Sequence, residues 1–262
     1  MSSRVHGGAG SFPSMALHQG PGVFGTSWLF VHYAVLMPGS GIGYHRHDRC
    51  EEMFTALDNA LRFKHNGNVA ELRGPVMVPC REGESHGVYN HTSKPTRFMN
   101  FCVTEPGGQY DCTDYGDDLV DAVPGPAERL PAQWIDRKLL TWGPAGHGGR
   151  GSLGFRRILG PDDFRTTWAF VDHILIPPAC SIGYHRHDGI EECYIILAGE
   201  GRLTMDGRTE VVKVGDAALN RLGGSHGIYN HTDELLEVLN VAVALEKGRL
   251  DATDQGDDLS KR

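Results

Sequence analysis

The sequence predicts an all-β protein built from two tandem copies of one antiparallel barrel or sandwich. An internal repeat is the first indication: Ile42–Asp48 recurs unchanged as Ile182–Asp188, and the same offset of 140 residues relates Ser85–Thr92 to Ser225–Thr232. The 35 glycines in 262 residues indicate many tight turns, since the usual share is about 7%. Short runs rich in β-branched and aromatic residues, separated by turn signals, are typical of such barrels.

The expected strands follow in the same order in the two copies. Asn66-Gly67 and Asp206-Gly207 are strong signals for two-residue hairpin turns. The strands that we predict around them are Trp28–Met37, Met53–Leu57, Leu61–His65 and Thr96–Val103 in the first copy, and Trp168–Ile176, Cys193–Leu197, Gly201–Met205 and Leu235–Ala244 in the second.

The joint between the copies is expected in the segment Val123–Pro131, whose three prolines suit a linker. We therefore predict an N-terminal domain over residues 1–125 and a C-terminal domain over residues 126–262. A helix is predicted only over Ala132–Leu140, where the apolar residues recur roughly at the helical period.

The charge distribution excludes some classes of partner. The formal net charge is −8, from 25 basic and 33 acidic residues, and each predicted domain carries −4. Neither domain is basic, so nucleic acid and anionic membrane surfaces are not expected partners. The N-terminus shows no apolar stretch of the kind that targets secretion, and we expect a cytoplasmic protein. The six cysteines form no close CxxC pair, so we expect free thiols.

Four side chains of metal-ligand type recur in each copy. In the second copy His185 and His187 stand two apart in an expected strand, so both side chains face the same side. Glu191, Glu192 and, much later, His226 follow. Three imidazoles and one carboxylate suit Mn, Fe, Ni, Cu or Zn better than Ca or Mg. The first copy offers the same four groups as His45, His47, Glu52 and His86.

These motifs resemble those of the cupin superfamily, in the two-domain form called a bicupin. The first cupin motif is a glycine, five residues, HxH, three or four residues, a glutamate, six residues and a glycine, and Gly39 with the first HxH pair fits its start. The six-residue step to Gly199 selects Glu192 over Glu191, and the repeat then selects Glu52 over Glu51. The second motif is matched by Gly83, His86 and Asn90, and by Gly215, Gly223, His226 and Asn230.

The sequence departs from the cupin pattern at turn positions. Arg81 and Arg221 replace a proline, and Ala179 replaces the leading glycine of the second copy. Asn59 and Pro75 stand in the first copy where the second has Gly199 and Gly215. These changes put loop shape in question and leave the ligands intact.

The resemblance implies two tandem antiparallel jelly-roll barrels, each with one divalent transition metal (Fe, Mn, Ni or Zn). The metal ligands would be His45, His47, Glu52 and His86 in the first barrel, and His185, His187, Glu192 and His226 in the second. A closed structural zinc site and a barrel that has lost its metal are the alternatives.

Recurring polar residues are weaker candidates for contact with a substrate. Asn90, Asn100, Asn230 and Asn240 would lie in the pocket or cap turns, and Arg62 and Arg202 would clamp a carboxylate or pair with an acid outside. The acidic segments Asp111–Leu119 and Asp251–Leu259 are expected to close each barrel. His6 and His147, each in His-Gly-Gly, are read as parts of glycine-rich loops rather than of a lid.

The predicted function is that of a metal-dependent enzyme acting on a small polar molecule with a carbonyl, carboxylate or enol oxygen. Oxygen-dependent chemistry (a dioxygenase) and non-redox isomerase, lyase or hydrolase chemistry stay open. The alternative class is a non-catalytic binding or storage protein. A small molecule is the expected partner, and a homodimer is left open.

Overall fold

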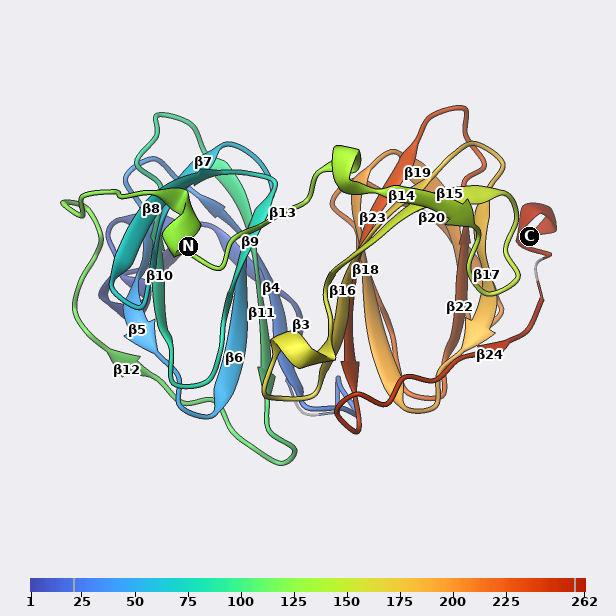
Figure 1. Cartoon of the computed structure of the whole chain (residues 1–262), viewed down its shortest axis with the longest axis horizontal. Helices are drawn as coiled ribbons and strands as arrows, with labels where there is room; N and C mark the ends of the chain where they lie inside the picture. Colours follow the sequence, from blue (N-terminus) through green and yellow to red (C-terminus); the bar gives the residue numbers. More distant parts are fainter. Residues whose placement is uncertain (21, 257) are drawn as a thin grey trace. The chain divides into compact units, whose positions relative to one another are not determined.

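The computed structural model describes residues 1–20, 22–256 and 258–262, and they divide into two compact units (Figure 1). Unit 1 comprises Met1–Val23, Trp28–Ile135 and Phe164–Thr166. Unit 2 comprises Phe24–Ser27, Asp136–Asp163 and Thr167–Arg262. The expected boundary after residue 125 stays a prediction. Each unit contains one short segment from the other half of the chain, namely Phe164–Thr166 in unit 1 and Phe24–Ser27 in unit 2.

Unit 1 is a jelly-roll barrel of two antiparallel sheets. The five-stranded sheet has the order β12-β5-β10-β7-β8, and the six-stranded sheet has the order β13-β9-β6-β11-β4-β3. Its strands, together with the small pair β1–β2, are β1 Ser2–Ser3, β2 Ser11–Phe12, β3 Ser14–Gln19, β4 Trp28–Leu36, β5 Gly41–Arg46, β6 Cys50–Ala56, β7 Ala60–His65, β8 Asn68–Arg73, β9 Val76–Cys80, β10 Ser85–Tyr89, β11 Thr96–Thr104, β12 Thr113–Asp114 and β13 Gln133–Trp134. Two 3-10 turns, η1 Val5–Gly7 and η2 Ala127–Arg129, complete it.

Unit 2 repeats this architecture. Its six-stranded sheet has the order β14-β15-β16-β23-β18-β21, and its five-stranded sheet has the order β20-β19-β22-β17-β24. The strands are β14 Thr141–Pro144, β15 Ser152–Leu159, β16 Trp168–Ile176, β17 Ser181–Arg186, β18 Ile190–Ala198, β19 Glu200–Met205, β20 Arg208–Lys213, β21 Ala217–Asn220, β22 Ser225–Tyr229, β23 Leu236–Ala244 and β24 Thr253–Asp254. The 3-10 turns are η3 Arg137–Leu139, η4 Pro161–Asp163 and η5 Leu259–Lys261.

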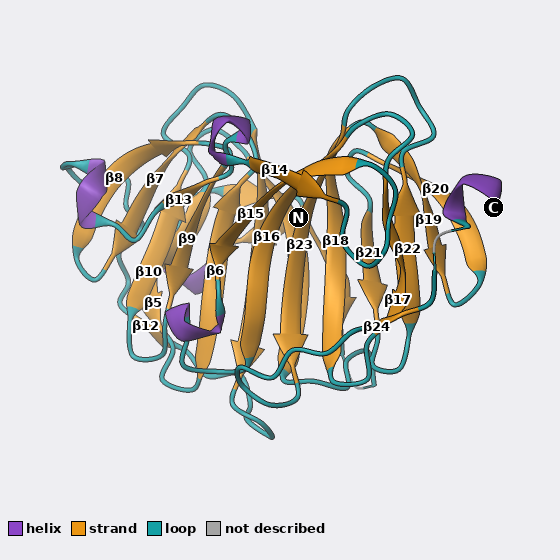
Figure 2. Ribbon diagram, turned by 45° about the vertical axis from the view of Figure 1, so that its right-hand side comes forward, coloured by secondary structure: helices purple, strands orange, loops and turns teal. Residues whose placement is uncertain are grey.

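The core of each unit lies between its two sheets, and Figure 2 shows the strands that enclose it. In unit 1 Phe54 and Phe98 of the six-stranded sheet pack with Phe63 and Val88 of the five-stranded sheet. In unit 2 Ile196 and Val238 pack with Leu203 and Ile228 in the same way. Strand β7 alternates buried and half-buried residues, which is how a strand buries one face. Every residue of β6, β16 and β23 is buried, so these strands of the six-stranded sheets bury both faces.

The predicted hairpins are confirmed. β7 and β8 are joined through Asn66 and Gly67, and β19 and β20 through Asp206 and Gly207. All four turn residues have positive φ angles, between 45° and 81°, as a type I′ turn requires.

The helix predicted over Ala132–Leu140 is wrong. That segment contains the short strand β13, which pairs with β9, and the 3-10 turn η3. Neighbouring residues there face opposite sides, as in an extended chain: Ile135 is 5% exposed, whereas Trp134 is 42% exposed. Within the described residues the structure has no α-helix, and no helix there is long and apolar enough to cross a membrane.

Two of the departures at turn positions keep the backbone conformation that glycine would adopt. Asn59 and Ala179 have φ angles of 49° and 59°. Asn59 offsets the strain with its side-chain amide, which donates to Thr92 Oγ1 at 2.7 Å and Thr96 Oγ1 at 2.9 Å. These two residues therefore preserve their turns, whereas Pro75, which follows a cis peptide bond, does not adopt the φ of 96° that Gly215 has at the matching position of unit 2. All six cysteines are free, as expected.

Candidate metal centre

Two strands of one sheet bring the three histidines of unit 1 together. His45 near the end of β5 and His86 in β10 are register partners, so their side chains face the same side. Their Nε2 atoms are 3.0 Å apart. His47 follows β5, and the alternation of the strand buries His45 and His47 while Arg46 between them points outward.

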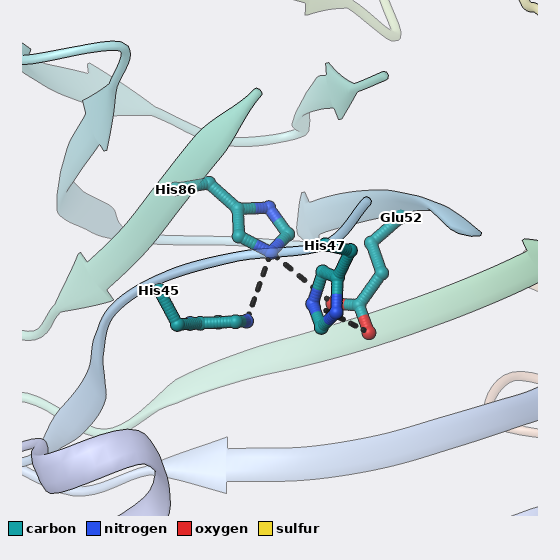
Figure 3. A group of neighbouring side chains, drawn as sticks. All are labelled: His45, His47, Glu52 and His86. Carbon is teal, nitrogen blue, oxygen red and sulfur yellow. Dashed lines mark hydrogen bonds and ion pairs between the residues drawn. The ribbon is translucent and has the colours of Figure 1, made fainter. Parts of the chain in front are cut away.

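The fourth group comes from the opposite sheet. Glu52 in β6 directs its carboxylate toward the three imidazoles (Figure 3). Its Oε1 lies 3.5 Å from His47 Nε2, and its Oε2 lies 3.4 Å from His86 Nε2. One ligand atom from each of the four side chains falls within 4.8 Å of the others, and all four residues are buried.

Unit 2 builds the same group from β17, β18 and β22. Glu192 Oε1 lies 3.4 Å from His187 Nε2, and its Oε2 lies 3.2 Å from His226 Nε2. The Nε2 atoms of His185 and His226 are 3.1 Å apart. The two groups of the repeat thus agree in residue types, strand positions and distances.

The nitrogen atoms of these groups fit a metal ion. His45 Nδ1 donates a hydrogen bond to the Gly43 carbonyl oxygen at 2.7 Å, and His47 Nδ1 donates to the Asp111 carbonyl oxygen. With the proton on Nδ1, the Nε2 atom of each neutral ring presents a lone pair to the centre. His47 Nε2 and Glu52 Oε1 are buried there without a hydrogen-bond partner, as is His187 Nε2 in unit 2. A cation would satisfy these atoms.

The electrostatics of the site set the protonation states of several of the ligands. Burial, with a further contribution from His86, lowers the pKa of His45 to about 2. Burial also lowers the pKa of His185 to about 3, with His226 and His147 adding to it. Burial alone would raise the pKa of Glu192, but the neighbouring histidines outweigh it and hold that pKa at about 2. The imidazoles of His45 and His185 are therefore neutral and the Glu192 carboxylate is ionised at neutral pH. The pKa of His47 differs: its burial is outweighed by Cys50 and Glu52, which raise that pKa to about 9, so a metal ion must displace the proton of this ring. The two groups support a divalent metal ion.

Two of the predicted asparagines lie at the site. Asn100 in β11 donates from Nδ2 to Glu52 Oε2 at 3.0 Å, and Asn240 in β23 donates to Glu192 Oε2 at 3.0 Å. Each asparagine lines the cavity of its own unit. A side-chain amide thereby orients the ligand carboxylate.

The other two asparagines lie in turns, away from the cavities. Asn90 donates from Nδ2 to the carbonyl oxygens of Leu36 and Lys94, and its Oδ1 accepts from the Thr92 N–H. Asn230 makes the matching contacts in unit 2. The strand ends one residue before each asparagine, so the regular alternation that would have turned the side chain inward stops there.

The two candidate arginines also lie outside the cavity linings. Arg62 donates from Nη1 to the carbonyl oxygens of Leu119 and Val120, while its Nη2 contacts Glu71. Arg202 donates to the carbonyl oxygens of Ser260 and Arg262. Each arginine holds the chain segment after the acidic motif against its own barrel.

The acidic motifs hold one histidine of each metal group in place through hydrogen bonds. In unit 1 the Asp111 carboxylate accepts from the N–H groups of Asp48 and Arg49, and its carbonyl oxygen accepts from His47. Asp251 repeats the contacts in unit 2. The expectation that these segments close the barrels is consistent with this packing; Asp257, in the second motif, lies outside the described residues.

A cavity opens beside each metal group. The cavity of unit 1 has a volume of about 700 Å³, and that of unit 2 has about 410 Å³. His45 and Glu52 line the first, and His185, His187 and Glu192 line the second. Molecules in these cavities would reach the ligand side chains directly.

His6 and His147, which we read as parts of glycine-rich loops, lie at these cavities. The His6 ring stacks on His45 with ring centroids 3.9 Å apart, and the His147 ring stacks on His185 at 3.6 Å. His6 Nδ1 lies 2.8 Å from Asp114 Oδ1. The recurrence of His-Gly-Gly in both copies was the signal that could have revealed this placement.

Glycines permit that stacking, because the backbone of each His-Gly-Gly segment lies directly against the backbone of the strand that carries the ligand histidine. A Cβ atom added to Gly43 would lie 2.0 Å from the His6 carbonyl oxygen, and one added to Gly183 would lie 1.9 Å from that of His147. No side chain fits in that space, so the glycine of each Ile-Gly-Tyr-His motif allows the His-Gly-Gly segment to reach the ligand histidine.

An ion pair that the sequence did not reveal lies in the cavity of unit 2. Arg157 binds Asp172 through Nε–Oδ1 and Nη2–Oδ2 contacts of 2.9 and 3.0 Å, and both residues line the cavity. Burial raises the pKa of Asp172 to about 6, against the opposing effect of Arg157. In unit 1 His32 occupies the position that matches Asp172 in the repeat, and it lines that cavity.

Comparisons with known proteins agree with this fold and site. The family description "Cupin domain" matches residues 172–242. The chain is 33% identical over 98 residues to the oxalate-binding protein of Thermotoga maritima, covering 37% of this chain and 81% of that protein. Because that relative is covered over most of its length, the chain belongs to the cupin superfamily, here with two barrels in one chain.

Two solved structures show the same two-barrel fold at low sequence identity. A protein of Pseudomonas aeruginosa described as glyoxylate induced superposes with a TM-score of 0.68 at 16% identity, covering 93% of this chain and 84% of that one. Salicylate 1,2-dioxygenase from Pseudaminobacter salicylatoxidans superposes with a TM-score of 0.63 at 14% identity, covering 88% and 76%.

Proposed function

We propose that the protein is a metal-dependent enzyme acting on a small polar molecule that bears a carbonyl, carboxylate or enol oxygen. The observation that carries this proposal is the convergence of three imidazoles and one carboxylate beside an open cavity, in both units. Such a ligand set suits Fe, Mn, Ni or Zn and leaves positions free for a substrate. A bound ion would supply Lewis-acid chemistry at the substrate oxygen.

The ligands would be His45, His47, Glu52 and His86 for one ion, and His185, His187, Glu192 and His226 for the other. Asn100 and Asn240 would hold the ligand carboxylates in place by their hydrogen bonds. The stacked rings of His6 and His147 would shield one side of the first histidine of each set from water.

We propose unit 2 as the catalytic unit. Its cavity is the smaller one and contains the Arg157 guanidinium, which Asp172 holds in place through two hydrogen bonds. A guanidinium beside a metal group suits a small substrate with a carboxylate. The name of the oxalate-binding relative supports a small carboxylate as the ligand class. Unit 1 would bind its ion in an auxiliary role.

Non-catalytic binding of a small molecule is the second candidate, and it is favoured by the same relative, which is named for binding. Oxygen-dependent and non-redox reactions both suit the ligand set, since Fe and Mn share these donors. The cytoplasmic location and the homodimer stay predictions.

Metal analysis and oxygen uptake together test the proposal. The protein is purified without added metal, its metal content is measured, and small carboxylates are offered under air and under nitrogen. Turnover that requires oxygen identifies a dioxygenase, whereas turnover under nitrogen identifies non-redox chemistry. Binding without turnover in the metal-loaded protein would contradict the enzyme assignment.

A pair of matched variants tests which unit is catalytic. His226→Ala should abolish turnover, and His86→Ala should leave most of it, because each removes one ligand from one unit. The opposite result, with both proteins folded, would place the chemistry in unit 1.

A further inference from the structure

A second group of ligand-type side chains lies next to the first in unit 1. His65 ends β7, Cys80 ends β9, and Glu84 lies in the turn before β10. One imidazole nitrogen, the Cys80 sulfur and one Glu84 oxygen all fall within 4.8 Å of one another. His65 Nε2 is 3.0 Å from Glu84 Oε2.

Strand register places this group beside the candidate metal centre. His65 is the register partner of His86 across β7 and β10, and Cys80 is the register partner of Glu52 across β9 and β6. Register partners point to the same face of a sheet and lie roughly 5 Å apart. Each of these two residues is therefore one strand away from a ligand of the first group.

The turn that carries Glu84 is held in a fixed shape. The Arg81 N–H donates to Glu84 Oε2 at 2.7 Å, and the Glu84 N–H donates to the Arg81 carbonyl oxygen at 3.0 Å. Gly83 in the same turn has a φ of 78°, and its N–H donates to the His47 carbonyl oxygen at 2.7 Å. The carboxylate is thus directed at His65 before any ion binds.

The group is shielded from water and keeps a route from solvent. Burial raises the pKa of the Cys80 thiol, so the charge of a bound ion would have to displace its proton. Cys80 is 2% exposed and His65 is 6% exposed, so few water molecules compete for their ligand atoms. The side chain of Glu84 is 21% exposed, which opens the group on one side.

We propose that His65, Cys80 and Glu84 bind a zinc ion that is separate from the ion of the His3Glu group. A thiolate, an imidazole and a carboxylate are zinc ligands, and the sulfur makes Mn or Mg a poor fit. Three protein ligands leave the fourth tetrahedral position to water. Coordination by Cys80 releases its thiol proton to solvent. The ion would tie the end of β7 to β9 and to the turn before β10.

The three side chains of this group do not recur at the matching positions of unit 2. At the offset of 140 residues, unit 2 has Met205, Asn220 and Gly224 in place of the histidine, cysteine and glutamate. Asn220 there donates to the Gly224 carbonyl oxygen at 3.4 Å. The repeat thus supplies a natural metal-free reference, and the inference holds whether or not the protein is an enzyme.

Cobalt substitution tests the proposal, because only cobalt bound to a thiolate gives an intense near-ultraviolet charge-transfer band. The full chain is stripped with a chelator and titrated with Co²⁺. The wild-type protein should show the band, and it should bind three equivalents of metal. Cys80→Asn, which introduces the residue found in unit 2, should lose the band and one equivalent while it keeps the other two.

Two further variants separate this site from its neighbours. Cys50 lies near His47 and Asp111, and it is a second buried thiol that could bind cobalt beside the first group. Cys50→Ser should keep the band. Glu84→Gln should weaken the cobalt affinity that is measured from the growth of the band. A wild-type protein without the band, or a band that survives Cys80→Asn in a protein with unchanged circular dichroism, would overturn the proposal. Cys80→Ala serves as the second variant if Cys80→Asn does not fold.

Discussion

Glu191 and Glu192 are adjacent in β18, but their carboxylates serve opposite faces of the strand. Glu192 lies 3.2 Å from His226 and accepts from Asn240. Glu191 accepts hydrogen bonds from the Gly25 N–H, the Thr26 N–H and the Thr26 hydroxyl at 2.9, 3.0 and 2.6 Å. Both side chains are buried. The Glu192 carboxylate belongs to the metal group, and the Glu191 carboxylate binds the loop that contains Gly25 and Thr26.

The two glutamates should therefore respond differently to removal of charge. Glu192→Gln should weaken metal binding by more than the roughly 10–100-fold loss typical of changing an outer-shell partner, because it removes the anionic ligand. Glu191→Gln should leave metal binding unchanged and lower the free energy of unfolding by about 1–3 kcal/mol, since its hydrogen bonds to buried donors weaken. Isothermal titration with metal and urea unfolding measure the two effects. Reversed effects would mean that the strand has a different register.

Removing the HxH pair of one unit should remove one ion. In the double variant His185→Ala, His187→Ala the metal content should fall by one equivalent, because the ligands of unit 1 do not depend on this pair. Elemental analysis of the purified, fully loaded protein measures the content. An unchanged content would refute the assignment of these ligands.

The metal-free protein should lose stability as the pH falls below 6.5. Burial holds the pKa of His45 near 2 and that of His185 near 3, whereas an unfolded histidine titrates near 6.5. Below pH 6.5 these two histidines are protonated in the unfolded chain but stay neutral in the folded protein. The unfolded state therefore binds more protons, and the free energy of unfolding falls as the pH falls. Each of the two histidines contributes about 1.4 kcal/mol per pH unit in that range. Urea unfolding of the metal-free protein at pH 7 and pH 5.5 measures this effect. In His185→Asn the free energy of unfolding should depend less on pH. Equal stability of the wild-type protein at the two pH values would contradict the prediction.

A methyl group at the stacking glycine should be costly. Gly183→Ala would place a Cβ atom 1.9 Å from the His147 carbonyl oxygen, so the His-Gly-Gly segment must move. We expect a loss of about 1–3 kcal/mol in the free energy of unfolding, as is typical of overpacking. Gly143→Ala is the control, because nothing lies within 4 Å of its added Cβ atom. Equal stability of the two variants would show that the segment does not pack on β17 in this way.

The repeat made most of the fold and the metal group predictable. Residues at the offset of 140 carry the same strand pattern, and a pattern of period two decides which neighbour of each pair faces inward. It correctly separated Glu192 from Glu191 and His185 from Arg186. It did not decide between pocket and turn for Asn90 and Asn230, because the strands end one residue before them. The helical spacing over Ala132–Leu140 led to a wrong prediction, because Gln133 and Trp134 pair with β9.

Long-range contacts were the part that local patterns could not reveal. His6 reaches His45 across 39 residues of sequence through a close backbone approach that no periodicity encodes. Arg157 and Asp172 lie on paired strands, but their pairing depends on the register of β15 and β16, which contains a shift. The burial of Glu191 depends on Gly25 and Thr26, which are more than 160 residues away.

The placement of Phe24–Ser27 in unit 2 and of Phe164–Thr166 in unit 1 limits how the chain can be divided. A gene fragment ending in the proline-rich linker would encode Glu51 without the N–H groups of Arg165 and Thr166 that bind its carboxylate. The complementary fragment would leave Glu191 without Gly25 and Thr26. Each fragment would carry a buried anion stripped of its donors, so we expect either half of the sequence to be less stable alone than in the full chain.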